Sequence, residues 1–351
     1  MRLRRDTRAA LGALAGLGLM AIGALALLLA GLLLYAEHLR AEREASTSTA
    51  LAPPGSRWVE SGDAELFIRQ WGPADGPLLL LSHGTGAWSG TWFDLPDALA
   101  AAGWRVIAVD LPPFGFSKTH AAPASADYRR AAQAKRLLAL LAALGQKDVT
   151  LVGHSFGAGP ALEAAMLDDG RLRQLVLVDP ALGLGSNGEA PACAPEGVTD
   201  AMLSSRALRS VLVGGIATEP RFTPFLLAQF VHRKEAVSPA RVPAYQQPFR
   251  QAGFSDGLGH WARAFARASC EDAQSLSPAA LRNWSFKGLP VKLLWGEKDT
   301  VTPLAQARSL QEWMPQTTLD VIPQVGHIPH IEDPEAFARS LIRAVGTPRP
   351  Q

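Results

Sequence analysis

The sequence lacks a strong charge of either sign. Its 351 residues include 34 Lys and Arg against 32 Asp and Glu, which gives a formal net charge of only +2 at pH 7. Proteins that bind nucleic acid usually carry a pronounced basic patch, because they must neutralise phosphates. No basic stripe is present in the body of the sequence, so we expect no nucleic-acid partner.

Cysteine is nearly absent as well. Only Cys193 and Cys270 are present, and no Cys/His cluster has the spacing of a zinc site. No G-x-G-x-x-G fingerprint joins a predicted strand directly to a predicted helix. We therefore expect neither a metal nor a cofactor. In an oxidising compartment the two cysteines could form a disulfide, and the alternative of two free thiols stays open.

Charge is missing entirely from one long run near the N-terminus. Residues 9–36 are 28 uncharged residues dominated by Leu, Ala and Gly. About 20 apolar helical residues are enough to cross a bilayer, whereas the hydrophobic stretch of a signal peptide spans only about 7–15. We therefore favour a retained membrane anchor over a cleaved signal peptide or a buried core helix.

The charges on either side of this run predict its orientation. Four of the first eight residues are arginine, opposed only by Asp6, whereas the acidic and basic residues from 37 to 44 nearly cancel. By the positive-inside rule the N-terminus is cytoplasmic. The rest of the chain is then extracytoplasmic, as in a bacterial envelope. We expect residues 37–56 to form a short helical stalk and a flexible tether.

From residue 57 onward, strand and helix patterns alternate. A hairpin with Gly62 and Asp63 at its turn is followed by predicted strands at 77–84, 104–111, 148–153, 173–179, 290–299 and 317–322. Helices are predicted at 91–102, 127–144, 156–169, 303–313 and 334–345. This alternation predicts an α/β fold with a mostly parallel sheet flanked by helices.

The alternation is interrupted between residues 183 and 287. A structureless loop of this length is improbable in a compact domain, so we expect an inserted, mainly helical cap or lid. The predicted organisation is a cytoplasmic basic end with a transmembrane anchor (1–36), a linker (37–56), the first part of the α/β core (57–182), the cap (183–287) and the second part of the core (288–351).

Four polar signals follow predicted strands, where ligands bind in open α/β sheets. The segment HGTG spans 83–86, and Ser155 lies in GHSFG at a strand-to-helix corner. Asp299 ends WGEKD, and His327 lies in VGHIPH. Taken alone, Ser155 or Asp299 could equally cap a helix.

The order Ser, Asp, His resembles that of the α/β-hydrolase superfamily, and the likeness spans about residues 58–346. GHSFG matches the nucleophile elbow, and HGTG resembles the oxyanion loop. WGEKDTVTP and VGHIPHIEDPEAF resemble the acid and histidine segments. VDLPPFGFS resembles the loop that follows the next strand, although Pro113 stands where glycine is usual.

The resemblance implies a role for each residue. Ser155 would be the nucleophile, His327 its base and Asp299 the acid that orients the histidine. Backbone N–H groups of Thr85 and Phe156 would form the oxyanion hole. Two alternatives stay open in the sequence: Asp179, which also ends a predicted strand, as the acid, and His330 as the base.

A serine at the corner favours acyl transfer to water, so we expect hydrolysis of a carboxylic ester, or of a related acyl compound such as a thioester or amide, through an acyl-enzyme. We expect the substrate to be small and apolar. Carbon–carbon bond hydrolysis and perhydrolysis, which relatives with the same triad perform, are the alternatives. A non-catalytic, membrane-anchored binding module is the alternative from another class. We expect Trp88, Trp92 and Trp261 to contact the substrate; the oligomeric state is left open.

Overall fold

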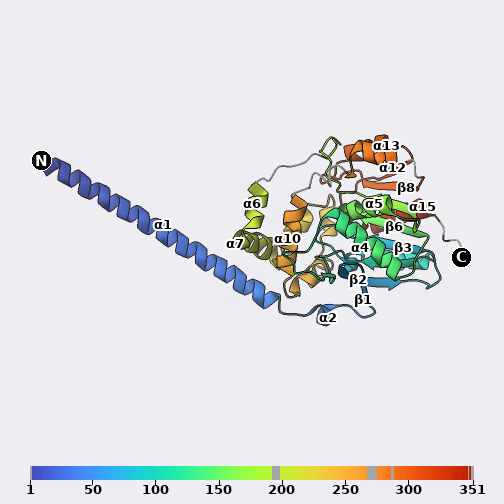
Figure 1. Ribbon diagram of the computed structural model, residues 1–351, viewed down its shortest axis with the longest axis horizontal. Coiled ribbons are helices and arrows are strands. Elements are labelled where there is room, and N and C mark those ends of the chain that lie inside the picture. Colours follow the sequence, from blue (N-terminus) through green and yellow to red (C-terminus); the bar gives the residue numbers. More distant parts are fainter. Residues whose placement is uncertain (1, 192–197, 267–274, 286–287, 347, 349–351) are drawn as a thin grey trace.

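The computed structural model describes residues 2–191, 198–266, 275–285, 288–346 and 348. Cys193 and Cys270 lie outside these ranges, so the structure does not bear on their pairing. Figure 1 shows a compact α/β body from which one long helix, α1 (Arg2–Arg43), departs.

A nine-stranded sheet with the order β1-β2-β4-β3-β6-β7-β8-β9 forms the centre of the body, with β5 paired to β2. Strands β1 and β2 form the predicted antiparallel hairpin, and β2 is antiparallel to β4. From β4 to β9 all neighbours are parallel. The strands are β1 (Arg57–Glu60), β2 (Ala64–Trp71), β3 (Leu78–Ser82), β4 (Arg105–Val109), β5 (Lys118–Thr119), β6 (Val149–His154), β7 (Leu172–Val178), β8 (Val291–Gly296) and β9 (Thr318–Ile322).

Helices cover both faces of this sheet, because successive strand side chains point to opposite sides. Leu80 and Leu151 belong to one hydrophobic cluster, which also holds α4 (Arg130–Ala143), α5 (Ala158–Leu167) and α13 (Ala305–Trp313). Leu79 and Val152 belong to the opposite cluster, with α3 (Leu95–Ala101) and α15 (Pro334–Val345). The predicted α/β class, with a mostly parallel sheet between helices, is confirmed.

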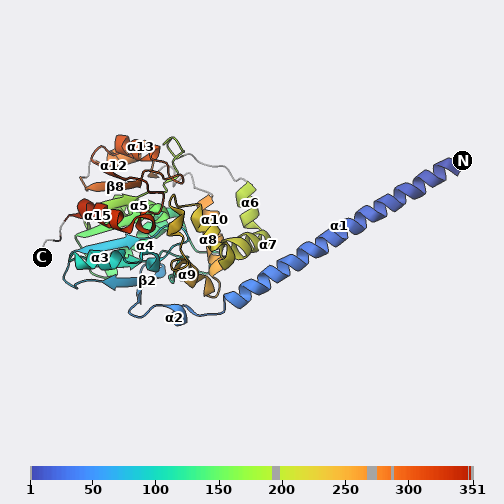
Figure 2. The same cartoon turned by 180° about the vertical axis from the view of Figure 1, so that it is seen from behind.

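Between β7 and β8 the described chain forms mostly short helices rather than strands. We call the described residues from 198 to 285 the inserted helices. They are α6 (Val198–Ser204), α7 (Arg206–Arg209), the π-helix η3 (Ser210–Ala217), η4 (Pro220–Phe222), α8 (Thr223–Ala228), η5 (Lys234–Ala236), α9 (Val242–Gln246), η6 (Gln247–Arg250), α10 (Phe254–Ala266) and α12 (Pro278–Ser285). Among them α6, α7 and α10 lie on the side of the body from which α1 departs, whereas α12 lies beside α13 (Figures 1 and 2).

Helix α1 is continuous through the first part of the expected stalk. Its stretch Leu19–Arg43 is long and apolar enough to cross a membrane. At its end Arg43 donates to the Gly214 carbonyl and to Thr218 Oγ1, both at 3.0 Å. The next residue, Glu44, accepts from the Ser255 backbone N–H at 3.3 Å. These polar side chains, at the end of the expected helical stalk, bind the inserted helices.

Candidate active site

Ser155 lies at a sharp corner between β6 and α5, in the 3-10 turn η2 (Ser155–Gly157). Its φ is +50°, which is unusual for a non-glycine residue. The corner requires glycine on both sides. A Cβ on Gly153 would lie 2.6 Å from Ala158 Cα, and one on Gly157 would lie 2.4 Å from the His83 carbonyl oxygen. The motif G-x-S-x-G therefore has a steric cause here.

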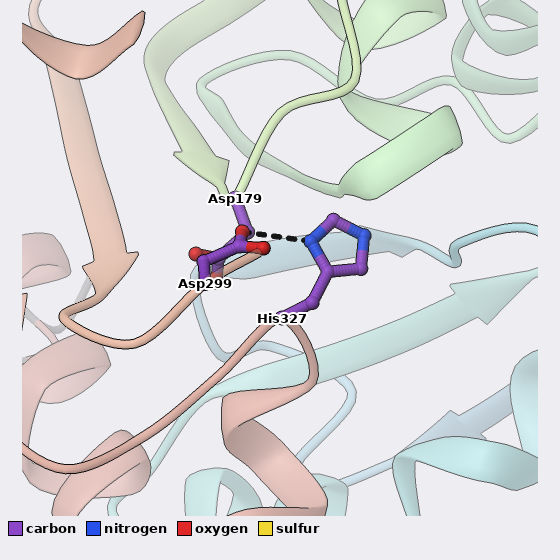
Figure 3. Close-up of side chains that lie close together, drawn as sticks. All are labelled: Asp179, Asp299 and His327. Carbon is purple, nitrogen blue, oxygen red and sulfur yellow. Dashed lines mark hydrogen bonds and ion pairs between the residues drawn. The ribbon is translucent and has the colours of Figure 1, made fainter. Parts of the chain in front are cut away.

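Two loops bring His327 and Asp299 to this serine. Asp299 follows β8 and His327 follows β9, so both come from the carboxyl edge of the sheet. His327 Nε2 lies 2.8 Å from Ser155 Oγ. His327 Nδ1 lies 2.8 Å from Asp299 Oδ2, and Figure 3 shows the His327 ring turned toward this carboxylate. All three side chains are buried. This geometry makes Nδ1 the protonated nitrogen and leaves Nε2 free to accept the serine proton.

Asp299 is held as a carboxylate by several donors. Its Oδ1 accepts backbone N–H groups of Val301 at 2.7 Å and Thr302 at 3.0 Å, and its Oδ2 accepts the Thr302 hydroxyl at 2.6 Å. Burial alone would raise the pKa of Asp299. The hydrogen bond and charge of His327, together with the Thr302 donors, outweigh burial and hold this pKa below its usual value.

Asp179, the alternative acid, has a different environment. Its Oδ1 accepts the Gly296 N–H at 2.8 Å. The side chain is fully buried, and burial together with the neighbouring Asp299 charge raises its pKa well above the usual value. One polar atom from each of Asp179, Asp299 and His327 lies within 4.8 Å of the other two. A cation there would have to displace the bond between Asp299 and His327.

Three further histidines surround the site, and burial lowers the pKa of each. The pKa of His83 falls to about 4, and the His83 Nε2 accepts the Leu111 N–H at 3.0 Å. The pKa of His154 falls to about 3, and the His154 Nε2 donates to the His327 carbonyl at 2.8 Å. His330, the alternative base, packs with its ring centroid 4.6 Å from that of Trp92. The structure therefore brings His327, rather than His330, to Ser155.

The predicted oxyanion residues follow β3 and β6. Phe156 is the second residue of η2, and backbone N–H groups in the first turn of a helix have no intrahelical acceptor. Thr85 is exposed and follows Gly84. A Cβ on Gly84 would lie 3.1 Å from Ser155 Cβ, so this loop passes close to the serine.

The three predicted substrate-contacting tryptophans lie in different environments. Trp88 is buried and donates through Nε1 to the Ala244 carbonyl at 2.7 Å. Trp92 is buried against His154 and His330. The Trp261 ring centroid is 5.3 Å from that of Phe156. Among the three, Trp261 therefore has the most direct contact with the site.

Two partly exposed phenyl rings from the inserted helices also lie beside residues of the site. Phe230 is 37% exposed, and its ring centroid is 6.2 Å from that of His327. Phe265 is 49% exposed, and its ring centroid is 6.3 Å from that of Phe156. Their aromatic character was visible in the sequence, but their proximity depends on how the inserted helices pack.

Comparison with known proteins agrees with this architecture. Residues 77–334 match the family described as alpha/beta hydrolase fold. The chain belongs to the α/β-hydrolase family. It is a hydrolase of this fold, as the sequence motifs predicted.

Individual relatives differ in activity. An uncharacterised protein of Mycobacterium bovis is 28% identical over 301 residues, covering 78% of this chain and 77% of the relative. A 2-hydroxymuconate semialdehyde hydrolase of Pseudomonas sp. (strain CF600) is 29% identical over 268 residues, covering 75% and 84%. The solved structure of a membrane phospholipase A, a bacterial virulence factor, has a TM-score of 0.62 at 24% identity, covering 97% of this chain and 98% of that one.

The raised pKa of Asp179 predicts a pH-dependent effect of Asp179→Asn on stability. Above about pH 4 the unfolded chain releases this proton while the folded chain keeps it, so the wild type loses stability as pH rises. Asparagine removes that loss. We expect the variant to gain stability relative to wild type between about pH 4 and pH 7, measured by denaturant unfolding. Asp75→Asn, at an exposed position, is the control. An equal gain in the free energy of unfolding at about pH 4 and at about pH 7 would contradict the prediction.

Proposed function

We propose that the protein is a serine hydrolase that acts on carboxylic esters with an apolar acyl group. The observation that carries this proposal is the unbroken hydrogen-bond chain from Ser155 Oγ through the His327 ring to Asp299 Oδ2, with both links at 2.8 Å. A serine hydroxyl is a weak nucleophile until a base removes its proton, and this chain supplies the base in the required tautomer.

In the acylation step, Ser155 Oγ bonds to the ester carbonyl carbon while its proton passes to His327 Nε2. The carbonyl oxygen becomes an oxyanion, which the backbone N–H groups of Phe156 and Thr85 would stabilise. Asp299 stabilises the imidazolium through Nδ1. The tetrahedral intermediate then collapses, and the departing alkoxide takes the proton from Nε2.

Deacylation repeats these transfers with water. His327 Nε2 takes a proton from water as the water oxygen attacks the acyl carbon. Ser155 Oγ then leaves, recovers the proton from His327, and the carboxylic acid is released. No other acid or base is needed, which agrees with the neutral state that burial favours for His83, His154 and His330.

The N-terminal helix supports a location at the membrane. Its apolar stretch is long enough to span a bilayer, and the flanking arginines favour a cytoplasmic N-terminus with the hydrolase domain outside. The likeness to the membrane phospholipase A covers 97% of the chain, so it includes this helix. We therefore propose a retained anchor and an ester substrate drawn from, or close to, the lipid phase.

A second candidate activity is hydrolysis of a carbon–carbon bond. Relatives in two Pseudomonas strains, 28% and 29% identical, are 2-hydroxymuconate semialdehyde hydrolases. The Phe230 and Phe265 rings favour the ester, because they place apolar surface rather than anion-binding groups beside His327 and Phe156.

Ser155→Ala is expected to lower ester turnover at least about 10⁴-fold, because it removes the hydroxyl that lies 2.8 Å from His327 Nε2. Its stability should remain close to that of wild type. The measurement is p-nitrophenyl ester hydrolysis together with labelling by a fluorophosphonate probe, mapped by mass spectrometry. Folded wild-type protein that resists the probe would support the binding-module alternative instead.

Asp299→Asn is expected to slow turnover by about 10⁴-fold, because the amide would favour the wrong tautomer of His327. Asp179→Asn is the matched control, because Asp179 offers a carboxylate oxygen within 4.8 Å of the ligand atoms of Asp299 and His327. This variant should retain most turnover. The check is kcat for the same ester in both variants. If Asp179→Asn were the slower enzyme, the acid role would belong to Asp179.

A substrate panel separates the two candidate activities. We expect p-nitrophenyl esters of increasing acyl length to be hydrolysed with a higher kcat/KM than a 2-hydroxy-6-oxo-dienoate. The phenyl rings beside the site provide apolar contacts for an acyl chain but no partner for the dienoate carboxylate. A kcat/KM that favours the dienoate would establish the carbon–carbon activity in place of the esterase.

A further inference from the structure

One buried carboxylate lies directly behind the loop that carries His327. Glu332 ends the short helix α14 (Pro329–Glu332) and is buried. Its two oxygens accept four backbone N–H groups. Oε2 accepts Gly326 at 2.9 Å, His232 at 2.8 Å and Arg233 at 2.9 Å, and Oε1 accepts Ile328 at 3.2 Å.

These four donors come from two parts of the chain. Gly326 and Ile328 are the neighbours of His327 on either side. His232 and Arg233 belong to the loop that follows α8 in the inserted helices. The His327 N–H itself donates to the Phe230 carbonyl at 3.3 Å. Glu332 therefore joins the backbone of the histidine loop to the backbone of the segment that carries Phe230.

The two segments approach as closely as their backbones allow. A Cβ at Gly326 would lie 2.6 Å from the His232 nitrogen and 2.9 Å from Glu332 Oε1. Arg233 adds a second connection, since its Nε donates to the Gln324 carbonyl at 2.9 Å and its Nη1 to Asp333 at 3.0 Å. A displacement of residues 230–233 would therefore displace the loop of His327.

Only a carboxylate satisfies this arrangement. Its oxygens offer about four acceptor sites and no donor, which matches four converging N–H groups. Bonds from N–H groups to a charged acceptor are about twice as strong as neutral ones. A glutamine with its carbonyl oxygen at the Oε2 position would keep three of the donors but lose the negative charge. Its –NH₂ group would then face the Ile328 N–H and leave it unpaired in a buried place, at a cost of about 1–3 kcal/mol.

We propose that Glu332 is a positioning residue of the hydrolytic reaction, which sets His327 against Ser155 and Phe230 against the acyl group through the same four backbone contacts. This inference rests on the proposed function. It makes the inserted helices part of the catalytic geometry, because two of the four contacts come from them.

The test is Glu332→Gln in the full-length, detergent-solubilised protein. We expect kcat per active site to fall by about 10- to 100-fold, since small displacements of a catalytic group have effects of this size. KM for a short-chain ester should change less than kcat. The ratio of kcat/KM for long and short acyl chains should also change, because Phe230 moves with the loop.

Active sites are counted by complete reaction with the fluorophosphonate, so unfolded protein does not enter kcat. Glu335→Gln is the matched control: its carboxylate is 89% exposed and contacts only Arg339 among the described residues. If Glu332→Gln is too unstable, Glu332→Asp keeps both oxygens on a shorter stem, and we expect an intermediate loss of kcat and the same change in chain-length preference.

Unchanged kcat per titrated site and unchanged chain-length preference in the Glu332 variants would overturn the inference and leave Glu332 a role in stability only. That result is distinct from failure of the proposed function. In the latter case folded wild-type protein itself would not react with the fluorophosphonate or hydrolyse esters.

Discussion

The functional arrangement depends on one constraint, the pair of hydrogen bonds that holds the His327 ring between Ser155 and Asp299. Each partner follows a different strand of the parallel sheet, β6, β8 or β9, at the same carboxyl edge. Parallel pairing from β4 to β9 gives these strands a common direction, so their ends and the loops beyond them lie together. The sheet thereby brings together three residues that are distant in sequence, and two hydrogen bonds of 2.8 Å join them.

Burial controls which titratable groups around Ser155, His327 and Asp299 carry charge. Desolvation favours the neutral form of a group unless donors or opposite charges compensate. Asp299 has such compensation from His327 and Thr302, whereas Asp179 has one backbone donor and an acidic neighbour. Two carboxyl groups of the same type therefore differ in protonation within one site. The neutral histidines add no charge that would compete with the imidazolium formed during attack.

Much of this arrangement could be predicted from the sequence, because it follows from local rules. Alternating apolar runs and helical patterns predict the sheet and its flanking helices, and the glycines around Ser155 predict the corner. The environment of Trp88 and the contacts of Glu332 could not be predicted. Both depend on the inserted helices, whose packing on the sheet is not encoded in a short motif. The contacts of the residues after the apolar run could not be predicted for a similar reason. Arg43 and Glu44 belong to the expected helical stalk, and their hydrogen-bond partners Gly214 and Ser255 are about 170 to 210 positions away.

The unbroken course of α1 has a geometric consequence. A domain on a flexible linker samples every direction that its linker can reach. Here the helix continues from its apolar stretch to Arg43, and the next residue is already bonded to α10. In a bilayer, the angle between α1 and the membrane normal would therefore set which surface of the hydrolase domain is turned toward the lipid. A change in bilayer thickness that tilts the helix would rotate the whole domain with it.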